Sequence, residues 1–186
     1  NVASVSAEEA PVLRPYIKLS ELLGTFLGQV KAGTENILSV KIEFDGKASK
    51  LNQSPIIASA LCGLLKGYSD IVNMVNSTYL AAQKGIELSS VNHNRKCDYQ
   101  SLLRVTAFYE EGKRTIAGTL IGGSMPRITE VQGISVEANF SKNMLYIRNH
   151  DKPGFIGSIG TILGEKDINI ASFHLGRRVK SGEAIA

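Results

Sequence analysis

Near the start of the chain, apolar residues recur every three or four positions, which is the period of an amphipathic helix. This repeat predicts a helix from about residue 6 to residue 31. Ser6 and Glu9 have the spacing of a capping box at its beginning. Pro15 should kink or restart the helix, because proline has no backbone N–H to donate. Gly33 should mark its end.

Beyond this helix, the pattern alternates between the period of a strand and that of a helix. Apolar and polar residues alternate over 38–44, which is typical of a half-buried strand. The nearly all-apolar run after Ser54 and Pro55 predicts a central helix. The predicted elements are, in order, strand 38–44, helices 54–68 and 76–84, strand 86–91, a hairpin of strands 99–109 and 114–121, and strands 127–131 and 134–138.

Residues 144–171 predict a strand, a tight loop, a glycine-spaced helix and a second strand that opens with Asn169. The N-terminus of a helix presents unpaired N–H groups and a partial positive charge, so the loop before it suits a carboxylate. We expect a carboxylate to meet the backbone N–H groups of residues Gly154, Phe155 and Ile156. The side chains of Asn149, Asp151 and Asn169 are candidates to hold an ammonium group. The sequence therefore predicts a pocket for a free amino acid, with no nucleophile or base in it.

Each of these residues also has a purely structural explanation. Asp151 has the position of an N-cap, and Asn169 fits a turn or a strand end. Glycine lowers helix stability by about 1 kcal/mol per position relative to alanine. Gly154, Gly157 and Gly160 should therefore make some contact that offsets this loss. Close approach of a backbone or a ligand would provide it at Gly154 and Gly157. For Gly160 we favour tight packing of the helix on a sheet.

Composition and charge exclude several classes of protein. The net charge of +4 comes from scattered residues rather than a basic stripe with interleaved aromatics, which argues against nucleic-acid binding. No run of eighteen apolar residues suggests a membrane span. Cys62 and Cys97 do not make a disulfide framework, which favours a reducing, cytoplasmic setting.

Motifs for metal and catalytic chemistry are equally sparse. The histidines lack metal-ligand spacing, so we expect no metal site. G-x-S-x-G, the P-loop and G-x-G-x-x-G are all absent, and we assign no catalytic residue. Arg127 with Lys113 and Arg114 is a possible anion site, although we favour solvated surface charges there.

Residues 148–177, RNHDKPGFIGSIGTILGEKDINIASFHLGR, followed by SGEAIA, resemble the ACT domain of the D-3-phosphoglycerate dehydrogenase family. The upstream part resembles the intervening, or allosteric substrate-binding, domain of that family. The resemblance implies an α+β fold: a mixed α/β intervening domain over 1–138, followed by a partial ferredoxin-like (βαββαβ) ACT domain over 139–186. The ACT unit stops at Ala186, where its third strand should be running, so we expect further chain or another subunit to cover its sheet.

What the resemblance implies about function is regulatory. In the family, L-serine binds at the ACT interface between subunits of a homo-oligomer, at positions that match Asn149, Asp151 and Asn169. Some members bind an anionic effector in the intervening domain, and Arg127 is the one position that carries over. NAD belongs to catalytic domains that this chain lacks, so the chain alone should hold no cofactor. The alternatives are a domain of an L-serine dehydratase beta subunit, whose cluster needs several cysteines, and a freestanding amino-acid-binding module.

Overall fold

The alternating residues that follow the first helix form an inner strand of a six-stranded sheet. The computed structural model describes residues 5–30, 36–93 and 97–186. The strand order is β2-β1-β3-β4-β5-β6, with β1 and β2 parallel and every other neighbouring pair antiparallel. The strands are β1 (Ser39–Gly46), β2 (Glu87–His93), β3 (Ser101–Tyr109), β4 (Gly112–Ile121), β5 (Met125–Val131) and β6 (Ile134–Asn139). The predicted α+β fold is confirmed.

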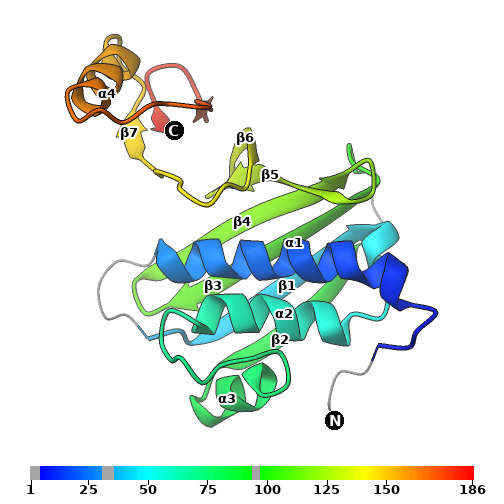
Figure 1. The fold of residues 1–186 in the computed structure, drawn as a ribbon. Helices are drawn as coiled ribbons and strands as arrows, with labels where there is room; N and C mark the ends of the chain where they lie inside the picture. The colour runs from blue at the N-terminus through cyan, green and yellow to red at the C-terminus, as the bar shows by residue number, and fades with distance from the viewer. Residues whose placement is uncertain (1–4, 31–35, 94–96) are drawn as a thin grey trace.

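Two long helices lie side by side over one face of this sheet (Figure 1). They are α1 (Ala10–Gln29) and α2 (Ser54–Leu65), and the short helix α3 (Ser77–Gln83) packs against α2. The two long helices approach closely through glycines, because a Cβ at Gly24 would overlap the carbonyl oxygen of Ala60. The hydrogen bonds of the predicted capping box form, since the Glu9 N–H donates to the Ser6 Oγ at 3.2 Å, but α1 begins only at Ala10, after a turn over residues 7–9.

The sheet has one apolar and one polar face. Val40, Ile42 and Phe44 are fully buried under the helices. Their neighbours point to the other face, because successive strand residues alternate. That face carries ion pairs, among them Glu43 with His93 at 2.7 Å and Arg104 with Glu130 at 2.9 Å. A short 3-10 helix (Lys47–Lys50) follows β1.

The C-terminal residues form a second, smaller sheet of order β7-β9-β8. Its strands are β7 (Arg148–His150), β8 (Gly176–Arg177) and β9 (Glu183–Ile185), and α4 (Phe155–Gly164) connects β7 to β8. Both β7 and β8 run antiparallel to β9. The strands β7 and β8 of this β-α-β unit are therefore parallel to each other, with β9 inserted between them. This is the beginning of a ferredoxin-like arrangement.

Several local predictions were wrong. The strand expected from Asn169 does not form, and residues 165–175 contain no strand. The apolar side chains of this segment, including those of Ile168 and Ile170, remain exposed to solvent, so forming a strand here would bury no apolar surface. No atom outside the helix lies within 4 Å of a Cβ built at Gly157 or Gly160 among the described residues, so neither is a packing glycine. Helix α1 runs through Pro15 without restarting, and Gly33 lies outside the described residues.

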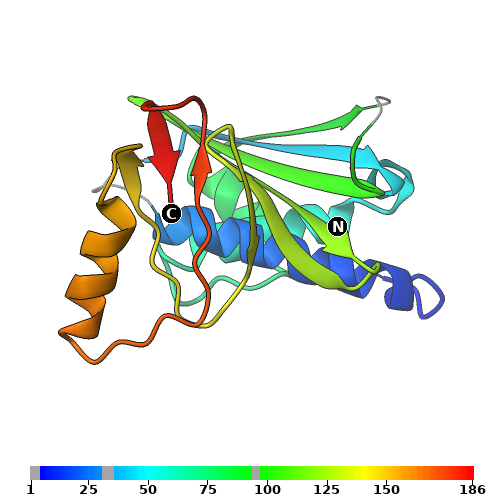
Figure 2. The ribbon, with the colours of Figure 1, turned by 90° about the horizontal axis from the view of Figure 1, so that it is seen from above.

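The second sheet lies against the first unit near β6 and the C-terminal end of α1 (Figures 1 and 2). The rings of Phe26 and Tyr146 meet edge to face with centroids 5.4 Å apart. Ile185 of β9 belongs to the same buried cluster as the helix–sheet core. The two units therefore contact each other through an interface that includes Phe26, Tyr146 and Ile185. Among the described residues, no helix is long and apolar enough to cross a membrane.

Candidate functional site

The corner between β7 and α4 is built around Gly154. This residue is the N-cap of α4 and has φ +89°, a left-handed conformation that glycine adopts without steric cost. No side chain caps the helix. The Phe155 N–H donates to the Lys152 carbonyl at 3.4 Å. The next N–H groups of the first turn, from Ile156 on, have no partner within an α-helix, so they are available to an anion. The corner therefore keeps the positive end of α4 open, as the sequence predicted for a carboxylate.

Asp151 is anchored by the opposite side of the small sheet. Its Oδ2 accepts a hydrogen bond from Arg177 Nη1 at 2.7 Å and one from the Ser181 backbone N–H at 3.2 Å. The Arg177 guanidinium, followed by the Ser181 N–H, holds the pKa of the Asp151 carboxyl below its usual range. The Asp151 N–H donates to the Gly182 carbonyl at 2.8 Å. Asp151 is thus not the N-cap of α4, and its carboxylate is already paired with the Arg177 guanidinium.

Asn149 lies on β7 opposite Ala184 of β9. Its Nδ2 donates to the His150 carbonyl at 3.0 Å. Its Oδ1 is buried and has no hydrogen-bond partner among the described residues. A buried acceptor without a donor carries a desolvation penalty, so this oxygen is a candidate for a ligand's N–H group.

The other predicted residues are less closely gathered. Phe155 is half-buried on the first turn of α4, and Ile156 beside it is 54% exposed. Asn169 is exposed and follows the C-terminal end of α4. A ten-residue helix spans about 15 Å, and α4 leads away from β7 (Figure 2), so Asp151 and Asn169 lie before and after a helix of that length. Within one chain the two side chains do not meet.

The possible anion site at Arg127 does not gather its three basic residues. Arg127 pairs with Thr119 across β4 and β5, and Arg114 lies five residues further along β4. Five strand residues span about 17 Å, which separates Arg127 from Arg114 and from neighbouring Lys113. The last two line a cavity of about 310 Å³ between the units, together with Arg148 and Arg178.

Arg177 is the residue of this corner that sequence reasoning missed. The sequence shows it only as half of a short basic pair with Arg178. It lies 26 residues from Asp151 along the chain, so only the pairing of β7, β9 and β8 brings it to the corner. No group of three or more His, Cys, Asp or Glu side chains suited to a metal ion occurs in the described part of the chain.

The fold and this corner define an α+β protein that joins a helix-backed mixed sheet to the beginning of a ferredoxin-like unit. Residues 12–132 match the family model for the D-3-phosphoglycerate dehydrogenase intervening domain, and the chain belongs to this family.

Similar proteins extend the match to the whole chain. D-3-phosphoglycerate dehydrogenase from a Synechocystis species is 33% identical over 186 residues, which cover 100% of this chain and 33% of the relative. The proteins of the same name from Bacillus subtilis and Methanocaldococcus jannaschii are each 31% identical, over 100% of this chain and 35% of their own lengths. The chain thus spans about a third of the length of these relatives.

Proposed function

We propose that this chain is the regulatory, oligomer-forming C-terminal region of a D-3-phosphoglycerate dehydrogenase, and that it binds L-serine or a similar small amino acid at the β7–α4 corner. The family match supports the parent enzyme. The observation that carries the binding site is the buried, unpartnered Oδ1 of Asn149, which lies two residues from Asp151 and close to the open N-terminus of α4.

The corner suits both ends of a zwitterion. The ligand's carboxylate would accept hydrogen bonds from the first N–H groups of α4, beginning near Phe155 and Ile156, where the helix dipole also favours negative charge. The ammonium would donate to the Asp151 carboxylate and to the Asn149 amide oxygen. A charge-assisted hydrogen bond is roughly twice as strong as a neutral one, so Asp151 should dominate the affinity.

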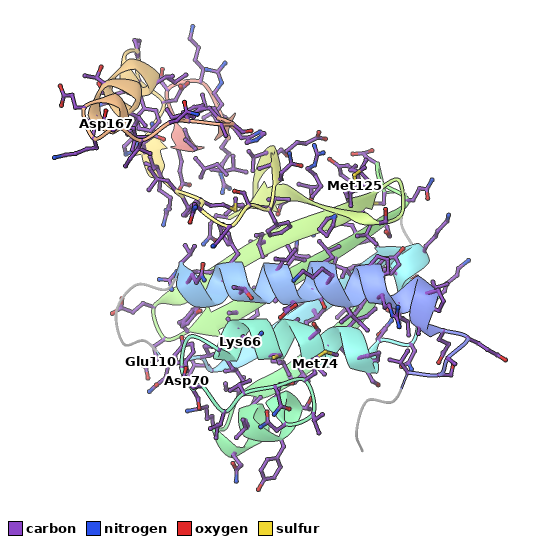
Figure 3. All side chains as sticks on the ribbon, in the orientation of Figure 1. Lys66, Asp70, Met74, Glu110, Met125 and Asp167 are labelled. Carbon is purple, nitrogen blue, oxygen red and sulfur yellow. The ribbon has the colours of Figure 1, made fainter. Side chains whose placement is uncertain are left out.

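Calorimetric titration with L-serine tests this assignment. We expect saturable binding to the wild-type chain and at least about a tenfold weaker affinity for Asp151→Asn, since the ammonium loses its counter-charge. Asp70→Asn is the matched control, because it makes the same change at an exposed residue of the first unit, after α2 (Figure 3), and should leave the affinity unchanged. Equal affinities of all three proteins, or no heat at millimolar L-serine, would contradict the assignment.

Self-association of the C-terminal unit follows from the same proposal. The side chains of Ile156 and Ile162 on α4 and of Ile168 just after it are all more than half exposed. A second copy that covers them would remove apolar surface from water, at about 25 cal/mol per Å². It would also supply Asn169, which is too far from Asp151 within one chain.

Sedimentation velocity tests the self-association. We expect the wild type to sediment as a dimer or larger species and Ile162→Glu as a monomer. Met125→Glu, on the first unit (Figure 3), is the control and should sediment as the wild type does. A wild type that is monomeric at high protein concentration would contradict the proposal.

Catalysis and NAD belong, in this proposal, to the remaining two thirds of the parent enzyme. The residues of this chain do not fit a dinucleotide, because the sequence has no G-x-G-x-x-G turn to approach a pyrophosphate. The parent would act in the cytoplasm, in the first step of L-serine synthesis.

A further inference from the structure

Two consecutive arginines, Arg177 at the end of β8 and Arg178 directly after it, bind different units. Arg177 Nη1 donates to Asp151 Oδ2 at 2.7 Å, within the small sheet. Arg178 Nη2 donates to the Gln132 carbonyl at 2.7 Å, in the turn between β5 and β6 of the first unit. Side chains alternate along a strand, so neighbours reach opposite ways. The end of β8 and the residue that follows it therefore link the candidate effector carboxylate to the intervening domain.

Close contact with β6 fixes the position of β8. A Cβ at Gly176 would overlap the carbonyl oxygen of Ser135 and lie 3.1 Å from the Ile134 side chain. Gly133 in the β5–β6 turn faces the Arg178 guanidinium in the same way, with 3.3 Å from an added Cβ to Arg178 Nη2. The contact tolerates little displacement, so a shift of β8 along or away from β6 breaks it as a whole.

We propose that the Arg177 guanidinium is an internal substitute for the effector's ammonium, and that an amino acid binding at Asp151 displaces it and loosens β8 from β6. This inference rests on the proposed function and adds the step that carries the signal to the first unit. The guanidinium and the ammonium are both cations that donate hydrogen bonds, so they compete for the same carboxylate oxygen. No proton or covalent bond changes hands in the exchange.

The Arg177–Asp151 pair is suited to exchange. The Arg177 side chain is 53% exposed and the Asp151 side chain 20% exposed. Exposed ion pairs contribute little to stability, so a ligand that also meets the N-terminus of α4 can replace one. The Ser181 N–H, which also donates to Asp151 Oδ2, keeps the carboxylate in place after Arg177 leaves.

A charge series at Arg177, measured by calorimetry, gives the first test. Arg177→Ala removes the internal competitor, so we expect L-serine to bind about two- to fivefold more tightly than to the wild type. Arg177→Lys keeps a competing cation and should bind as the wild type does. N-acetyl-L-serine, which lacks the ammonium, should fail to bind the wild type. Weaker binding of L-serine to Arg177→Ala would show that Arg177 holds the ligand and would overturn the inference.

Hydrogen exchange across the chain tests the second step. With saturating L-serine, we expect the amides of residues 132–139 and 176–178 to exchange faster, while those of α1 and α2 are unchanged. Gly176→Ala should produce the same pattern without any ligand, which tests the joint independently of the effector.

The two proposals fail in different ways. Binding of L-serine that depends on Asp151, without tighter binding to Arg177→Ala or faster exchange in β6, overturns the inference and leaves the proposed function intact. No binding to either the wild type or Arg177→Ala overturns both. Unchanged exchange in folded Gly176→Ala shows that β8 does not depend on its contact with β6, which also overturns the inference.

Discussion

Helices α1 and α4 both carry spaced glycines, yet their surroundings differ completely. In α1, a Cβ at Gly24 or Gly28 would overlap a backbone carbonyl oxygen of α2. In α4, a Cβ at Gly157 or Gly160 would meet nothing within 4 Å among the described residues. Glycine in α1 therefore permits two helices to approach closely, whereas glycine in α4 lowers helix stability with no contact in return. A glycine repeat alone does not reveal which of the two applies.

The same contrast extends to the two units. The first unit has a sheet whose apolar face is covered by α1 and α2, and its core residues Leu19, Leu23 and Leu61 are fully buried. In the C-terminal unit, no residue of α4 is buried. A rigid scaffold thus carries a lightly held module, and regions with few buried contacts open at low free-energy cost. The regulatory role proposed above requires this property.

The largest expected effect is at the α1–α2 contact. Gly24→Ala should lower the free energy of unfolding by about 3 kcal/mol, because the added methyl group forces two packed helices apart. Urea denaturation followed by circular dichroism measures it. If Gly24→Ala unfolds at the same urea concentration as the wild type, then α1 and α2 do not pack as closely at Gly24 as described.

An intermediate effect is expected on the polar face of the first sheet. Burial alone would raise the pKa of Glu43, but hydrogen bonds with His93 and Lys41 hold that pKa below its ordinary value of 4.5. A carboxyl whose pKa is lower in the folded state stabilises the fold above its unfolded pKa and loses this contribution as pH falls through the folded value. Glu43→Gln should therefore cost about 1 kcal/mol at pH 7, and the difference from the wild type should vanish as the pH falls through the folded-state pKa, which lies below 4.5.

Urea denaturation at a series of pH values tests this dependence. Glu110→Gln, at the exposed tip of the β3–β4 hairpin (Figure 3), is the control and should show no such dependence. A stability difference for Glu43→Gln that does not decrease as the pH falls below 4.5 and the folded-state carboxyl becomes protonated would rule out the ion pairs as its cause.

The smallest expected effect is an increase, not a decrease, in stability. Gly160→Ala fills open space on α4 and raises helix propensity, so it should stabilise the C-terminal unit by about 0.5–1 kcal/mol. Slower hydrogen exchange of the α4 amides would record this gain. Faster exchange would mean that another chain approaches α4 at Gly160, which would favour the self-association proposed above.

Sequence reasoning succeeded where periodicity is strong and local. The alternation over β1 and the hairpin of β3 and β4 led directly to the central strands, and Gly85 ends the turn after α3 with φ +73° as its position suggested. The family resemblance is also confirmed. The helix after the loop 149–154 was also expected, because a loop that ends in Pro153 and Gly154 before an apolar helical run is a local signal, although its N-cap is Gly154 and not Asp151.

Sequence reasoning failed where the pairing of distant segments determines the structure. The strand at Asn169 was predicted from its apolar neighbours, but an alternating run forms a strand only when a partner strand lies beside it. Arg177 went unnoticed because its role depends on β9, which lies between β7 and β8. The predicted residues Asn149 and Asp151 lie at one corner, whereas Asn169 lies at the far end of α4.

Hydrogen exchange of the 186-residue chain with and without saturating L-serine is the most direct test of a rigid scaffold carrying a responsive module. The account predicts altered exchange confined to the β7–α4 corner, β8 and residues 132–139, with the slowest amides in α1, α2 and β3 unaffected. Changes spread evenly over both units, or none at all at a concentration where L-serine is bound, would contradict it.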